Sequence, residues 1–157
     1  MKTFKAILLI SLLYVGGFYV YKSYENTEVS QVGVIAPNFL HTWFESDQKI
    51  DLKKPTFYIA WSSSCPRCIT NAPKYNKLYK KFKKKINFVG VSPNIDDGTK
   101  ELAKHYNRFP MNHDPKQMFF KYFGAFSFPY YVIVDNEHIV LSQGYDIKEN
   151  ILIKLAQ

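Results

Sequence analysis

Four short apolar segments, rich in β-branched and aromatic residues and bounded by turn residues, predict β-strands. They are Thr56–Trp61, Asn87–Val91, Tyr130–Val134 and Ile139–Gln143. The last two are separated only by the turn sequence Asp135–His138, so we expect them to pair as a hairpin. The first two are almost continuously apolar, which is typical of strands buried on both faces.

Helical periodicity fills the segments between the strands. From Pro66 to Lys84 apolar residues recur at helical spacing, and the opposite face carries lysines. Shorter helices are predicted over 99–106, 116–123 and 146–155. This order of strands and helices predicts an α/β sandwich with a mixed sheet, whose parallel part arises from right-handed crossovers. The lysine face is interpreted as a solvated helix surface, with acidic lipid or an acidic partner as the alternatives.

Length and composition narrow the class of protein. The chain has 157 residues, a net charge of +8, 46% apolar residues and two cysteines. This length suits one domain, and the composition excludes a disordered or collagen-like chain. Two cysteines cannot by themselves form a disulfide framework or a four-cysteine zinc site.

The N-terminal segment predicts export. Lys2 and Lys5 precede an uncharged run from Ala6 to Tyr21, which would span about 24 Å as a helix. Because flanking lysines can extend outward, we expect residues 1–22 to be an uncleaved membrane anchor, with a cleaved signal peptide or a buried helix as alternatives. A linker over 23–35 and a domain over 36–157 would then lie outside the cytoplasm, where disulfides persist.

A Cys-x-x-Cys motif follows the first predicted strand. Cys65 falls at the cap position of the helix, where free amide groups and the helix dipole favour a thiolate. Pro66 suits the first helical turn, and Arg67 adds a positive charge nearby. Cys68 lies one turn further, where we expect it to be more buried and to resolve a mixed disulfide.

Other interpretations of the two cysteines are a zinc site and an inert structural bridge. Zinc would need two further ligands, and the available histidines are irregularly spaced: His41, His105, His113 and His138. His113 and His138 are interpreted as surface or turn residues. We therefore expect no metal site and favour a redox pair.

From Ala36 onward the sequence resembles the thioredoxin-like superfamily, and within it the membrane-anchored TlpA/ResA group. The matching features are the opening Ala36–Phe39, the tryptophan Trp61, the helix proline Pro73 and the Phe128-Pro129 step. The resemblance implies a three-layer sandwich, a cis-proline at Pro129 beside the disulfide, and substrate contacts by Phe128 and Pro129. Residues 94–118 resemble the group's additional insertion.

The sequence also departs from the resembled group at four positions. Asn71 stands where ResA-like proteins carry a glutamate, and Ile59 where thioredoxin carries a buried acid. Neither of the usual proton-handling carboxylates is therefore present. Ser64 replaces a common aromatic residue, and Phe128 replaces a threonine or valine.

The resemblance implies an extracytoplasmic thiol–disulfide oxidoreductase whose redox group is the Cys65–Cys68 disulfide, without another cofactor. Its partners would be exported proteins with thiols or disulfides and a membrane redox partner. We expect no nucleic-acid partner. We expect Arg67 to make the pair less reducing than one with Gly-Pro between its cysteines. The alternatives are a copper chaperone on the same scaffold and a peroxidase, in which Ser62 would replace the usual threonine.

Overall fold

The computed structural model describes residues 30–37, 50–93 and 97–157. The predicted anchor, most of the predicted linker, His41 and the first residues of the predicted insertion lie outside these ranges. Within the described ranges, no helix has the length and apolar character needed to cross a membrane.

The described part contains five strands and four helices. The strands are β1 (Thr56–Ala60), β2 (Asn87–Ser92), β3 (Met111–His113), β4 (Tyr130–Val134) and β5 (Val140–Gly144). The helices are α2 (Pro66–Phe82), α3 (Asp97–Tyr106), α4 (Met118–Phe123) and α5 (Glu149–Leu155). The four predicted strands and four predicted helices are confirmed; half of their ends agree with the prediction and the other half shift by one to three residues.

The strands form one mixed sheet in the order β3-β2-β1-β4-β5. β1 pairs with β2 in parallel, and α2 provides the crossover between them. β4 pairs antiparallel with both β1 and β5, so the predicted hairpin is confirmed. The expected mixed-sheet α/β sandwich is therefore the observed fold.

The strand β3 was not predicted. It has three residues, its central residue is the polar Asn112, and it pairs with the end of β2 at the edge of the sheet. Asn112 is buried, and its side-chain amide donates to the carbonyl oxygen of Gly90 at 3.1 Å. A polar strand of this length has no apolar alternation from which it could be recognised.

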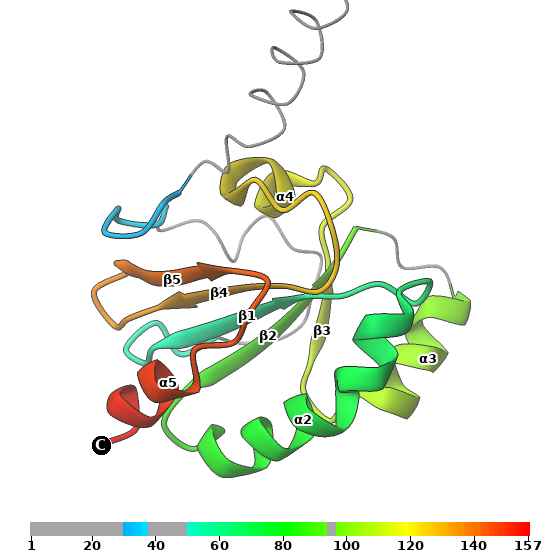
Figure 1. Cartoon of the computed structure of the whole chain (residues 1–157), viewed down its shortest axis with the longest axis horizontal. Coiled ribbons are helices and arrows are strands. Elements are labelled where there is room, and N and C mark those ends of the chain that lie inside the picture. The colour runs from blue at the N-terminus through cyan, green and yellow to red at the C-terminus, as the bar shows by residue number, and fades with distance from the viewer. Residues whose placement is uncertain (1–29, 38–49, 94–96) are drawn as a thin grey trace, which may run out of the picture.

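Helices cover both faces of the sheet (Figure 1). On one face, α2 and α5 pack on an aromatic-rich core that includes Phe57, Tyr75 and Tyr131. On the other face, α4 packs its three phenylalanines against β1 and β4. Since β1 and β4 are buried at every position, the centre of the sheet is a rigid support for the loops at its ends.

Residues upstream of Ala36 are hydrogen-bonded to the domain. The amide of Gly33 donates to the Val140 carbonyl at 2.8 Å, and Ile35 forms a bridge with Ile139. His138 has a positive φ of 65° at the turn between β4 and β5, and its carbonyl accepts from the Ala36 amide. The last residues of the predicted linker therefore lie along the edge of the sheet.

Candidate active site

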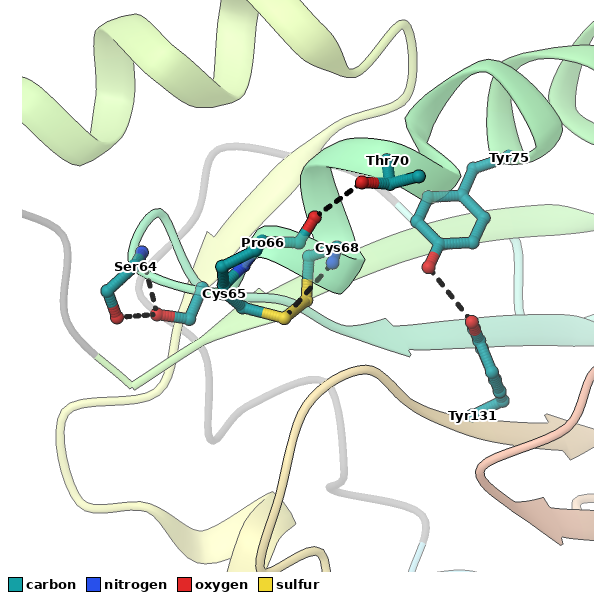
Figure 2. Close-up of a disulfide and its surroundings, with 8 residues drawn as sticks. Ser64, Cys65, Pro66, Cys68, Thr70, Tyr75 and Tyr131 are labelled. Carbon is teal, nitrogen blue, oxygen red and sulfur yellow. Dashed lines mark hydrogen bonds between the residues drawn. A yellow bond between two sulfur atoms is a disulfide. The ribbon is translucent and has the colours of Figure 1, made fainter.

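The cysteine motif lies at the start of α2, as predicted. Cys65 is the N-cap residue, with extended backbone angles, and its Sγ accepts the Cys68 amide hydrogen at 3.1 Å. Pro66 begins the helix, where its missing N–H costs no hydrogen bond. Figure 2 shows the two sulfur atoms beneath the first turn of the helix. The Cys65 sulfur is therefore held at the positive end of the helix dipole.

The two cysteines differ in accessibility. They are joined by a disulfide with a Cα–Cα distance of 5.2 Å. Cys65 is partly exposed, whereas Cys68 is fully buried in the aromatic core below α2. Cys65 is therefore the more accessible residue of the pair. This asymmetry was expected from the motif.

The segment before Cys65 connects the central strand to the helix. Trp61 is fully buried, its amide donates to the Val91 carbonyl at 2.8 Å, and its indole N–H has no hydrogen-bond partner among the described residues. The hydroxyl oxygen of Ser62 lies 2.9 Å from that of Ser64. The Ser62 hydroxyl considered for a peroxidase site is thus hydrogen-bonded to the Ser64 hydroxyl.

A cis-proline lies at the same end of the sheet as the disulfide. The Phe128–Pro129 peptide bond is cis, as the resemblance implied. Ala60 is paired with Tyr130 in the antiparallel register of β1 and β4, so the next residues outward are Trp61 and Pro129. Phe128 is half-buried, contacts both cores and meets Phe120 edge-on. Both residues predicted to contact substrate are thus beside the strand that leads to Cys65.

Two charged residues act on the buried core near the disulfide. Arg67 and Asp146, which follows β5, are both exposed. Burial raises the pKa of Tyr131, the neighbouring Tyr75 and then Asp146 act in the same direction, and the Arg67 guanidinium opposes the rise.

A pair of tyrosine hydroxyls lies behind the disulfide and was not anticipated from the sequence. The hydroxyl oxygens of Tyr75 on α2 and Tyr131 on β4 are 2.9 Å apart, as Figure 2 shows. Burial also raises the pKa of Tyr75, while hydrogen bonds with Tyr131 and Asn71 oppose that rise. Tyr131 is paired with Ile59 on the neighbouring strand.

This hydroxyl pair gives the interior below Cys68 a neutral polar centre. Both pKa values lie above the ordinary tyrosine value of 10.0, so both phenols keep their protons and stay uncharged near neutral pH. Sequence periodicity identifies Tyr75 and Tyr131 only as core aromatic residues, because their contact depends on the order of the strands.

The predicted helix proline, Pro73, lies within α2, which continues through it, and its side chain is exposed. The described residues include no group of three or more His, Cys, Asp or Glu side chains arranged to hold a metal ion. His105 and His113 lie on α3 and β3, and the ring of His105 packs against Tyr106.

The fold and the disulfide together define a thioredoxin-like protein with its Cys-x-x-Cys pair at the start of a helix. The sequence profile of the AhpC/TSA family matches residues 32–143, more than half of the chain. The chain therefore belongs to the AhpC/TSA family.

Solved structures with this fold include several thiol–disulfide oxidoreductases. The thioredoxin domain of one from Bacteroides vulgatus has a TM-score of 0.61 at 17% identity, covering 75% of this chain and 84% of that one. StoA from Bacillus subtilis has a TM-score of 0.55 at 17% identity, covering 67% and 84%.

The exposed lipoprotein thioredoxin Etrx1 from Streptococcus pneumoniae has a TM-score of 0.54 at 22% identity, covering 66% and 84%. None of the curated proteins is significantly similar to the chain in sequence.

Proposed function

We propose that the protein is an extracytoplasmic thiol–disulfide oxidoreductase that exchanges disulfides with exported proteins through Cys65 and Cys68. The observation that carries this proposal is the asymmetry of the pair: a reachable sulfur at a helix N-terminus is bonded to a buried one. Family membership and the fold support the same conclusion. The apolar N-terminal run in the sequence supports export, with membrane anchoring as part of the proposal.

In the reducing direction, the reaction begins with a Cys65 thiolate. It attacks one sulfur of a substrate disulfide, forms a mixed disulfide and releases the other substrate sulfur as a thiolate. The Cys68 thiolate then attacks the Cys65 sulfur and releases the second substrate thiolate. Two electrons pass to the substrate, the protons of the two protein thiols go to the two substrate thiolates, and Cys65–Cys68 becomes the disulfide. In the oxidising direction the same steps run backwards.

The surroundings of the two sulfurs divide the work between them. The Cys68 amide and the helix dipole stabilise negative charge on Cys65, which lowers its thiol pKa and makes it the attacking and leaving sulfur. Cys68 lies among apolar side chains, which protects it from outside nucleophiles. Pro129, beside the strand leading to Cys65, would contact the backbone of the substrate chain.

Trapping the mixed disulfide tests this assignment. With Cys68 replaced by Ala, Cys65 has no resolving partner. We therefore expect the full-length protein to accumulate disulfide-linked adducts, which a reductant should cleave. The matched control is Cys65→Ala, in which the remaining Cys68 is buried and should form few adducts. Equal trapping by both variants, or none by either, would contradict the proposed roles.

A further inference from the structure

The net charge of the chain is concentrated on one helix. The segment from Pro66 to Lys85 contains eight basic residues and no acidic residue, and the other 13 basic residues balance the 13 acidic ones. Seven of the eight are lysines between positions 74 and 85, all exposed. We call the outer side of α2 and its following turn the lysine face.

A groove lies along the lysine face and includes a cation from another element. Its volume is about 450 Å³. Its cationic lining residues are Lys77, Lys80, Lys83 and Arg108, which follows α3. Pro73 and Tyr79 contribute apolar surface, and the Lys83 ammonium lies 5.5 Å from the centre of the Tyr79 ring. The groove thus combines positive charge with an apolar wall.

Hydrogen bonds hold the two sides of the groove together. The side-chain amide of Asn76 donates to the Tyr106 carbonyl at 2.7 Å, and its oxygen accepts the Arg108 amide at 2.8 Å. Asn76 therefore fixes the segment after α3 against α2. Because of this contact, Arg108 faces the same groove as the lysines although 28 residues separate it from Lys80.

The charges of the groove are not neutralised within the described part of the chain. The ion pairs recorded there are Lys54–Asp51 and Lys104–Glu101, neither of which involves the groove. Like charges three and four positions apart on a helix repel one another. The helix dipole compensates lysines in the last turn, Lys80 and Lys81, but not Lys77. An anion in the groove would relieve this repulsion.

The lining of the groove favours a protein segment over a bilayer as the occupant. Its volume of about 450 Å³ and its mixture of lysines, Arg108 and an apolar wall suit an extended acidic chain. We propose that the lysine face and its groove bind an acidic segment of the protein with which Cys65 exchanges disulfides. This inference rests on the proposed function and adds the chemistry of the partner.

The geometry suits docking close to the reactive sulfur. Lys77 and Lys80 lie 12 and 15 residues after Cys65 on the same helix, which corresponds to about 18–22 Å along the axis. A partner held there can present a disulfide to Cys65 through a connection of about ten residues. Electrostatic attraction of this kind raises association rates and weakens as salt is added.

Three synthetic peptides test the proposal on full-length protein. Each carries the same disulfide, a flexible linker of about ten residues and a tail of about six Glu, Gln or Lys residues. We expect the Glu-tailed peptide to react about tenfold faster than the Gln-tailed peptide at low salt, and the Lys-tailed one to react slowest. The advantage should fall below about twofold near 1 M salt, where charges are screened beyond about 3 Å.

Charge-matched variants locate the effect. The triple variant Lys77→Gln, Lys80→Gln and Lys83→Gln should lose the advantage of the Glu tail. The control removes three exposed lysines elsewhere, Lys53→Gln, Lys116→Gln and Lys154→Gln, and should keep it. Equal loss in both variants would mean that only net charge matters, and would overturn the proposal.

Two further measurements separate the possible failures. Binding of a Glu-tailed peptide without cysteine, measured by fluorescence anisotropy, tests docking independently of disulfide exchange. If this peptide binds but no disulfide exchange occurs, the proposed function is wrong and the docking proposal still holds. Vesicles containing phosphatidylglycerol test the bilayer. If they bind the wild type more than the lysine-face variant, and the Glu tail gives no advantage, the surface faces a membrane and the proposal is wrong.

Discussion

The hydroxyl pair of Tyr75 and Tyr131 allows a quantitative test of how the core beneath the disulfide is held together. Their oxygens are 2.9 Å apart, and the two side chains are 0% and 4% exposed. Replacing either residue by Phe removes one hydrogen bond and leaves a buried hydroxyl without this partner, which costs about 1–3 kcal/mol in the free energy of unfolding.

The two single substitutions should differ. In Tyr131→Phe the Tyr75 hydroxyl still has the Asn71 side chain as a polar neighbour that lowers its pKa. In Tyr75→Phe the Tyr131 hydroxyl loses the one partner recorded for it among the described residues. We therefore expect Tyr75→Phe to be the more destabilising. The double variant leaves no buried hydroxyl unsatisfied, so its cost should be below the sum of the singles by at least about 1 kcal/mol.

Urea unfolding of the oxidised full-length protein, followed by circular dichroism, measures this coupling. Tyr106→Phe is a suitable control, because Tyr106 is partly exposed and its substitution should change stability by less than about 0.5 kcal/mol. Additive effects of Tyr75→Phe and Tyr131→Phe would refute the account of a coupled hydroxyl pair.

Three other predictions follow from the contacts described. Gly90→Ala should destabilise the protein by about 1–3 kcal/mol in urea unfolding, because a Cβ at this position would clash with the Met111 sulfur. Adding Met111→Ala should recover part of the lost stability. If it recovers none, the clash with Met111 is not the cause. Arg67→Gln should raise the Cys65 thiol pKa by about 0.2–0.7 units in pH-dependent alkylation and make the pair more reducing against glutathione, whereas the control Lys74→Gln should change neither.

The contribution of Tyr58, Tyr75 and Tyr131 to stability should be constant up to about pH 10 and then fall, because burial raises their pKa values above 10.0 only in the folded state. The unfolded chain therefore loses these protons first. The melting temperature of Tyr131→Phe should fall less steeply above pH 10 than that of the wild type. Equal slopes would refute the role of Tyr131 in this pH dependence.

The motif at the start of α2 could be predicted because its signals are local. A buried strand, a cap residue, a proline in the first turn and an apolar helix face all lie between Thr56 and Phe82. The hairpin of β4 and β5 was equally accessible, since a short turn sequence separates two apolar runs. The cis bond before Pro129 came from the resemblance and not from the residues alone.

The features that the sequence did not predict depend on contacts between distant segments. Tyr75 and Tyr131 are 56 positions apart, and they meet only because β4 lies next to β1 below α2. Arg108 enters the groove because Asn76 holds the segment after α3. β3 is too short and too polar to be recognised before its partner β2 is placed beside it.

The central claim is that Cys65 is an accessible thiolate stabilised by its position at the N-terminus of α2, with Cys68 buried behind it. The most direct test is the pH dependence of iodoacetamide alkylation of the fully reduced protein, with the modified cysteine identified by mass spectrometry. We expect Cys65 to be alkylated first, with a pKa below the ordinary thiol value of about 8.5, and Cys68 to stay unmodified in the folded protein. A Cys65 pKa at or above about 8.5, or equal alkylation of both cysteines, would contradict the claim.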